Sequence, residues 1–231
     1  MNEKAFTLSI ETAVHGGSIS LLCGISEIDC WIGTHETSKS EDILEEIKNI
    51  LERNNLEKKE IEKIVVSRGP GSFTGVRIGM AVATGLKKAL DCKWVAVSAL
   101  EGILLAGERE NADRIEEIIT AVPIGRNQFC WQHFKSHNRK IINSVTRPQL
   151  STMENFLISN SHNNFLFKKI IILHRKLYLD FQIKNENRFE ENNILIDAGE
   201  NIARFNGMLG AVQDEETFIS SPIYVKDGVF T

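Results

Sequence analysis

The stretch S-R-G-P-G-S-F-T-G-V-R-I-G-M-A-V-A-T-G-L-K-K-A-L, from Ser67 to Leu90, decides the fold of this chain. The apolar run 64–66, Ile-Val-Val, leads into it and predicts a buried strand. The Gly-Pro-Gly cluster at 69–71 ends a strand and turns the chain. Ser72 or Thr74 can then cap a helix by accepting a backbone N–H from its first turn. The stretch therefore predicts a strand, a tight turn and a helix.

Small residues recur on one face of this helix. Gly75, Gly79 and Ala83 are spaced four apart, so they share a face. Because each interior glycine costs about 1 kcal/mol relative to alanine, we expect a close neighbour there: a sheet, another helix of the chain or another subunit. A phosphate cradle is the alternative, since a glycine-rich turn before a helix binds anions. Neither G-K-[ST] nor G-x-G-x-x-G is present, and both interpretations stay open.

Composition narrows the class of protein. The 231 residues are 42% hydrophobic and 25% charged, as in an ordinary globular protein of one domain or two small lobes. A net charge of −4 argues against a general binder of polyanions. The apolar run near the start is too short for a signal peptide or a membrane span. Because of that short run, no membrane contact is expected. The four cysteines form no C-x-x-C pair, and without a targeting segment this predicts reduced thiols in the cytoplasm.

The eleven residues G-P-G-S-F-T-G-V-R-I-G, at 69–79, resemble the hallmark of the TsaB (YeaZ) family. That family belongs to the Gcp-like branch of the actin-like ATPase superfamily. The resemblance implies an α/β fold of two actin-like (ASKHA, RNase H-like) lobes, with mixed sheets and flanking helices. It places the first lobe at 1–106 and a second, divergent lobe at 107–205. The C-terminal tail, 206–231, is expected to pack back on the first lobe.

The same resemblance implies a function. Members serve as the non-catalytic dimerisation and activating subunit in tRNA N6-threonylcarbamoyladenosine synthesis. The expected partners are a TsaD-type catalytic subunit, a TsaE-type ATPase and a second copy of this chain through the same helical face. Contact with tRNA would be only indirect. This chain alone is expected to bind no cofactor, because ATP and a metal would be held by the partner subunits.

The small-residue helix is the expected partner interface. Its neighbour is the helix predicted at 40–53, which has a Ser38–Glu41 capping box and an apolar stripe at helical spacing. Two such helices would meet two from the partner in a four-helix interface. The residues expected to touch the partner are Val76, Gly79, Met80 and Ala83, with Arg77 at the rim.

The metal ligands of the catalytic sibling family are absent. That family resembles this chain over Val97–Leu104 but reads V-N-H-L-E-G-H-L, and its two histidines bind the active-site metal. When the two segments are aligned, these histidines correspond to Ala99 and Ile103 of this chain, whose side chains have no donor atom. A separate H-x-x-x-H, His133 and His137, lies in a predicted strand, where residues four apart are roughly 13 Å from each other. No metal site is expected.

Two segments resemble nucleotide-binding turns of the superfamily. Glu11 and Thr12 follow the first strand, where the family usually has Asp, and Asp197 and Gly199 lie in a second-lobe turn that packs against adenosine in nucleotide-binding members. These four residues are the candidate nucleotide ligands. A solvated strand end is the alternative for Glu11.

Rival functions remain at this stage. A free-standing actin-like nucleotide hydrolase or small kinase would rely on Glu11 and Asp197 as carboxylates. A glycoprotease-like metallopeptidase would need the ligands that are missing. The basic stretch 168–188 predicts either an RNA groove, with Tyr178 and Phe181 stacking on bases, or a central strand flanked by solvated lysines.

Overall fold

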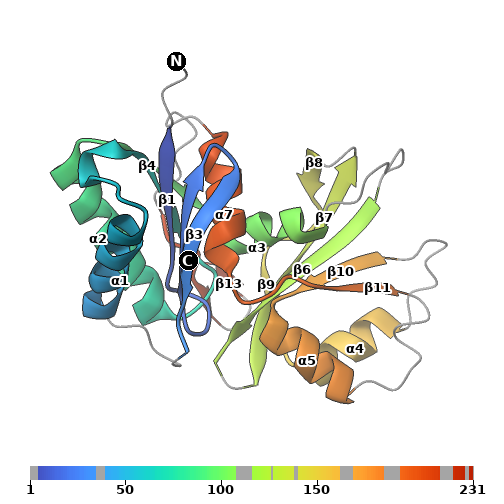
Figure 1. The fold of residues 1–231 in the computed structure, drawn as a ribbon. Coiled ribbons are helices and arrows are strands. Elements are labelled where there is room, and N and C mark those ends of the chain that lie inside the picture. The colour runs from blue at the N-terminus through green and yellow to red at the C-terminus, as the bar shows by residue number, and fades with distance from the viewer. Residues whose placement is uncertain are drawn as a thin grey trace.

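A computed structural model shows two sheets with helices on their faces, side by side (Figure 1). The structure describes residues 5–34, 40–107, 116–125, 127–137, 140–161, 169–184, 193–213, 221–226 and 229–230. The predicted α/β class with two mixed sheets is confirmed. The predicted lobe boundaries stay predictions.

The first sheet has five strands in the order β3-β2-β1-β4-β5. Its strands are β1 (Phe6–Glu11), β2 (Ser18–Cys23), β3 (Ser26–Ile32), β4 (Ile61–Ser67) and β5 (Lys93–Val97). The hairpins β1–β2 and β2–β3 are antiparallel, whereas β4 is parallel to β1 and to β5. The predicted buried strand is β4, which ends where the glycine-rich turn begins.

The second sheet follows the order β11-β10-β6-β7-β8, with β9 also paired to β7. Its strands are β6 (Glu116–Ile124), β7 (Gln128–His137), β8 (Lys140–Ser144), β9 (Gln149–Ser151), β10 (Lys169–Leu173) and β11 (Asn193–Asp197). Two helices, α4 (Met153–Ser161) and α5 (Arg175–Lys184), cover one face through an aromatic core that includes Phe129, Phe156 and Phe181. The apolar strand predicted at 170–173 lies within β10 and is fully buried.

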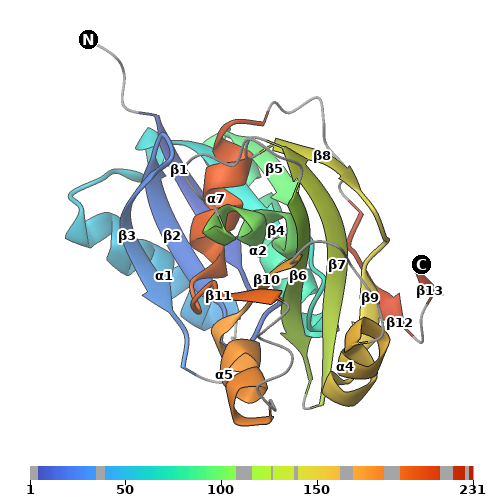
Figure 2. The same cartoon turned by 90° about the vertical axis from the view of Figure 1, so that its right-hand side faces the viewer.

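Helices cover both faces of the first sheet. On one face lie α1 (Ser40–Arg53) and α2 (Phe73–Leu90), separated in the chain by a short turn, η1 (Lys58–Glu60), and β4. Their apolar stripes join the strands in one core, with Ile43, Ile50 and Ala83 at 0% exposure. On the other face lies α7 (Ile202–Ala211), which reaches this sheet only after the chain has built the second one (Figure 2).

Between the sheets, Ser98 and Glu101 start α3 (Ala99–Gly102), which continues as η2 (Ile103–Gly107). Half of a capping box forms there: the Ser98 backbone N–H donates to the Glu101 carboxylate, while the Ser98 hydroxyl has no partner. Ser38, the capping residue predicted for the helix at 40–53, lies outside the described residues.

Helix α7 is fastened at both ends to the first sheet. Its cap, Asn201, accepts a hydrogen bond from the Arg204 N–H at 3.2 Å, and the Ala203 N–H donates to Ser18 Oγ at 3.0 Å. At the other end Lys63 Nζ on β4 donates to three carbonyls, those of Gly210, Ala211 and Gln213, at 2.9–3.1 Å. Because the last carbonyls of a helix have no partner within it, one cation satisfies two of them, together with the Gln213 carbonyl just beyond the helix.

The end of the chain returns to the first sheet. The Ile223 N–H donates to the Arg68 carbonyl at 2.7 Å, and the Tyr224 ring packs on Phe73 with centroids 4.7 Å apart. Beyond it, β12 (Val225–Lys226) pairs with β13 (Val229–Phe230) and lies beside β9 (Figure 2). None of the described helices combines the length and apolar composition needed to cross a membrane.

Replacing Lys63 by Met should lower the free energy of unfolding by about 2 kcal/mol, because hydrogen bonds to a charged group contribute roughly 1.5–3 kcal/mol. Urea denaturation followed by circular dichroism measures the change. Lys59→Met is the matched control, since Lys59 pairs with Glu57 at the surface and both side chains are exposed. An equal decrease in the free energy of unfolding of the two variants would mean that the contacts of Lys63 with the end of α7 contribute nothing to stability.

Candidate functional site

The small-residue face of α2 lies against the first sheet of the same chain. A side chain added at Gly75 would collide with the Thr12 carbonyl, and one added at Gly79 would collide with Thr12 Oγ1. The Thr12 hydroxyl donates to the Gly75 carbonyl at 2.7 Å. The glycines are therefore explained by the close approach of the β1–β2 turn to the helix.

The predicted partner interface is wrong for Val76, Gly79 and Ala83. Val76 and Ala83 are 0% exposed, and Gly79 is buried as well, because these positions form the inner face of α2. Only two of the five predicted residues reach the surface: Arg77 is exposed and Met80 is half-buried. Helical spacing identified a shared face but could not say which side of the helix it occupies.

The exposed face of α2 carries short side chains between two longer basic ones. The exposed positions are Phe73, Thr74, Arg77, Ala81, Thr84, Gly85, Lys88 and Ala89. A side chain added at Gly85 would meet no atom within 4 Å. At the start of this face the Arg77 guanidinium lies 3.7 Å from the centre of the Phe73 ring, which is 50% exposed. The small residues between Arg77 and Lys88, with the Arg–aromatic stack at one end, are thus open to solvent.

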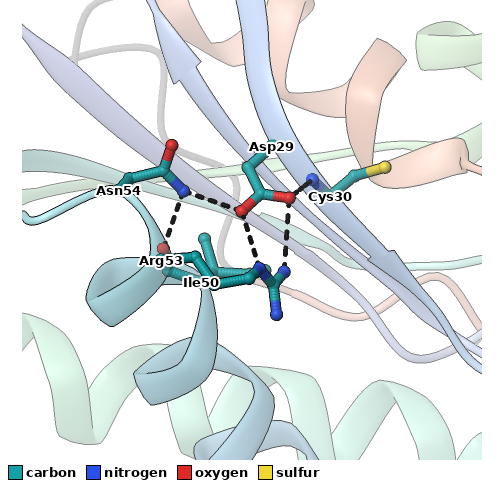
Figure 3. A network of polar contacts seen from close by, with 5 residues as sticks. All are labelled: Asp29, Cys30, Ile50, Arg53 and Asn54. Atoms are coloured by element: carbon teal, nitrogen blue, oxygen red, sulfur yellow. Dashed lines mark hydrogen bonds and ion pairs between the residues drawn. The ribbon is translucent and has the colours of Figure 1, made fainter.

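Helix α1 lies beside α2 and is held on the sheet by a polar network at its C-terminal end (Figure 3). Arg53 donates to both oxygens of Asp29 on β3, through Nε at 3.1 Å and Nη2 at 3.2 Å. Asn54 Nδ2 bridges Asp29 Oδ2 at 2.7 Å and the Ile50 carbonyl at 2.8 Å. Partial burial acts to raise the pKa of Asp29, but the hydrogen bonds from Arg53, Asn54 and the Cys30 N–H outweigh it and lower that pKa.

The network leaves the outer face of α1 free. Leu44 is 49% exposed there, next to the i,i+4 pair of Lys48 and Glu52. Together α1 and α2 present a two-helix surface, defined by Leu44 and Lys48 on α1 and by Thr74, Arg77, Ala81, Gly85 and Lys88 on α2. This two-helix surface replaces the one expected from the sequence.

Glu11 and Thr12 are neither solvated nor open to a nucleotide. Glu11 is 1% exposed and Thr12 is 6% exposed. Glu11 Oε1 accepts from the N–H groups of Ala13 at 2.5 Å and Val14 at 3.1 Å, and Oε2 accepts from Asn206 Nδ2 at 3.1 Å. Because Glu11 is buried, it is not a solvated strand end, and it does not reach a phosphate directly.

Burial has a defined effect on Glu11. Loss of solvent raises the pKa of its carboxyl, and hydrogen bonds from Ser67, Ala13, Val14 and Asn206 only partly oppose the rise. Its contribution to stability is therefore fully present below the pKa of an unfolded glutamate and is lost as pH rises through the folded pKa.

Several N–H groups of the glycine-rich turn already have acceptors within the chain. The Ser72 N–H donates to the Ala13 carbonyl at 2.7 Å, and the Gly75 N–H donates to the Ser72 side chain, the cap of α2, at 3.3 Å. These bonds favour the packing interpretation of the turn.

Asp197 and Gly199 lie at the carboxyl end of β11, and Ala198 between them belongs to the same buried cluster as Val14 of the β1–β2 turn. Asp197 Oδ1 accepts from the Gly199 N–H at 2.7 Å, and its Oδ2 accepts from Arg175 Nε at 3.1 Å. The sequence did not point to their neighbour His174, which is 1% exposed and whose Nδ1 accepts from the Lys176 N–H at 3.2 Å. The signal that the sequence offered was a histidine between a buried strand and a helix. In the structure this histidine, His174, caps the start of α5.

His174 has an unusual charge environment. Burial lowers its pKa to about 4, with further lowering by nearby His15, Lys176 and Arg175 and opposition from Asp197. Its Nε2 atom has no hydrogen-bond partner. The imidazole is therefore neutral at pH 7.

The remaining sequence candidates have structural roles. Ala99 and Ile103 are both 0% exposed in the core between the sheets. His133 pairs with Glu117 across the β6–β7 ladder, and no group of three metal-ligating side chains occurs among the described residues. Phe181 is 1% exposed and Tyr178 packs on the same core, so the pair is not available as a base-stacking platform.

Comparison with known proteins agrees with this architecture. The model of the family described as TsaD, tRNA N6-adenosine threonylcarbamoyltransferase, matches residues 35–178. The chain belongs to this family. Within it the chain is a member of the TsaB (YeaZ) group. It is 26% identical over 148 residues to the tRNA threonylcarbamoyladenosine biosynthesis protein TsaB of Escherichia coli, covering 62% of this chain and 63% of that protein.

Two further comparisons define the extent of the likeness. TsaB of Buchnera aphidicola is 33% identical over 89 residues, 38% of this chain and 40% of that protein. The aligned part thus spans less than two thirds of these relatives. A Pseudomonas aeruginosa protein with similarity to peptidase YEAZ superposes with a TM-score of 0.66 at 17% identity, covering 96% of this chain and all of the other, so the chain shares its fold. The predicted actin-like fold is confirmed.

Acidification should destabilise the protein through His174. Because its folded pKa of about 4 lies below the ordinary value of 6.5, stability is full above pH 6.5 and is lost as pH falls toward 4. The free energy of unfolding should drop by about 2 kcal/mol between pH 7 and pH 5 from this group. Asn can replace the cap acceptor without titrating. His174→Asn should therefore flatten this part of the profile in urea titrations; an unchanged slope would contradict the assignment.

Proposed function

We propose that this chain is a non-catalytic subunit in the synthesis of N6-threonylcarbamoyladenosine on tRNA, working in the cytoplasm. Its curated relatives are named for this pathway, and the matching family model is named for its transferase. The role we assign is to bind and activate a TsaD-type catalytic subunit. A TsaE-type ATPase would complete the complex, and tRNA would contact this chain only indirectly.

The observation that carries the proposal is the two-helix surface. A helix whose inner face is fixed on the sheet by glycine contacts presents an outer row of small residues, which lets another helix approach closely. The Arg77–Phe73 stack supplies the Arg and aromatic side chains that are enriched at interaction hot spots. Partner helices packing here would form a four-helix interface.

Charge on the two helices is segregated, and this suggests the chemistry of the partner. Helix α2 has Arg77, Lys87 and Lys88 and no acidic residue. Helix α1, S-E-D-I-L-E-E-I-K-N-I-L-E-R, has five acidic and two basic residues. A partner with an acidic helix over α2 and a basic helix over α1 would be complementary. A second copy of this chain related by a twofold axis also meets this condition, which supports homodimerisation through the same surface.

Gly85→Leu should weaken binding to the TsaD-type partner roughly 10- to 100-fold, because overpacking of a close contact costs about 1–3 kcal/mol. The variant should still fold, since Gly85 is exposed and leucine favours a helix more than glycine does. Size-exclusion chromatography and calorimetry of the co-expressed proteins measure binding, and a melting curve confirms the fold.

Two variants serve as controls for this experiment. Asn155→Leu changes an equally exposed helical position on α4, in the second lobe, and should leave the affinity unchanged. Gly79→Leu should instead destabilise the fold, because its side chain would enter the Thr12 contact. Wild-type affinity in a folded Gly85→Leu protein would exclude this part of α2 from the interface.

We also propose that the metal and ATP of the complex are held by the partner subunits. Ala99 and Ile103 occupy the ligand positions of the sibling family with buried aliphatic groups. Elemental analysis of the purified chain should find no stoichiometric zinc or iron, whereas the complex with its TsaD-type partner should contain about one metal. About one tightly held metal in the isolated chain would revive the enzyme interpretations.

A further inference from the structure

The Glu11 carboxylate is surrounded by donors from three separate parts of the chain. Oε1 accepts from two successive backbone N–H groups of the β1–β2 turn, those of Ala13 and Val14. Oε2 accepts from Asn206 Nδ2 on α7, and Ser67 at the end of β4 adds a side-chain hydrogen bond. Among the described residues, no Lys, Arg or His forms an ion pair with this carboxylate.

This arrangement supplies the hydrogen-bond donors of an anion site, while the loss of solvent acts against the charge and raises the pKa of Glu11. Successive backbone N–H groups that converge on one point form a concavity that binds anions, and such turns commonly hold phosphate. A carboxylate offers about four acceptor positions, and four donors meet it here. The group is 1% exposed.

We propose that the β1–β2 turn, Ser67 and Asn206 form a buried binding site for a carboxylate, which the chain fills with its own Glu11 and thereby closes to outside anions. The N–H groups that would receive a phosphate at this turn already donate to Glu11. A carboxylate suits these donors because its two oxygens receive them separately, the turn at Oε1 and α7 at Oε2. The inference is independent of the proposed partner.

The site can be emptied and refilled. Glu11→Ala removes the carboxylate and leaves the four donors in place around a small cavity. Unpaired buried donors are costly, so the variant should be less stable than the wild type. Formate or acetate should then enter and restore the hydrogen bonds. We expect 0.1 M sodium formate to raise the melting temperature of Glu11→Ala by about 2–4 °C over equimolar chloride, saturably, as ligand binding to the folded state does.

Three controls make the result specific. The wild type and Glu11→Gln should shift by less than about 1 °C, because both keep the cavity filled. Glu45→Ala, which removes an exposed carboxylate on α1, should not respond either. Sodium phosphate at the same ionic strength should stabilise Glu11→Ala less than formate does, since a tetrahedral anion is too large for the vacated volume.

The outcomes separate clearly. Equal shifts with formate in Glu11→Ala and in the wild type, or a phosphate effect as large as that of formate, would overturn the proposal. If Glu11→Ala does not accumulate in folded form, the denatured variant is refolded by dilution into formate or into chloride. The proposal then requires a several-fold higher folded yield in formate, and equal yields would refute it.

Discussion

The structure depends on one buried carboxyl group that forms no ion pair with any residue the structure describes. Glu11 joins the end of β1 to its own turn, to Ser67 at the start of the glycine-rich stretch and to Asn206 on α7. Burial opposes the ionisation of Glu11 more strongly than its hydrogen bonds favour it. Without these hydrogen bonds the buried carboxyl group would therefore cost still more free energy. Because they come from the β1–β2 turn, β4 and a helix near the end of the chain, they couple segments that the sequence separates by up to 195 positions.

The β1–β2 turn, which Glu11 holds in place, also determines the position of α2. The Thr12 carbonyl approaches Gly75 in the first turn of α2, and the Ala13 carbonyl approaches Gly71 just before the helix, so closely that a side chain at either glycine would collide with it. These contacts hold the inner face of α2 against the turn and leave its outer face exposed. The Asp29–Arg53–Asn54 network fastens the end of α1 in the same way. A surface that is already in place before binding lowers the entropy cost of binding a partner.

The polar groups around the two sheets differ in what they do. At the first sheet, polar contacts fasten α1, α2 and α7. At the second sheet, His174 and Asp197 lie at the carboxyl ends of adjacent parallel strands and hold the start of α5. In open α/β sheets this edge is where ligands usually bind. Here the side chains at the edge bond to their own backbone and to Arg175.

The sequence by itself predicted the strand, the turn and the helix over 64–90, because a Gly-Pro-Gly turn between an apolar run and a capped helix restricts backbone conformation locally. The two-lobe fold and the family followed from the resemblance of residues 69–79 to the TsaB (YeaZ) hallmark. The sequence also identified Ala99 and Ile103 as positions without donors, since that follows from residue type alone. Only the tertiary structure decided which face of α2 is buried and where the carboxylate of Glu11 points. Helical spacing shows which residues share a face, but not which neighbour covers that face. The donors to Glu11 come from distant segments of the chain. Both features were therefore decided only when the chain packed.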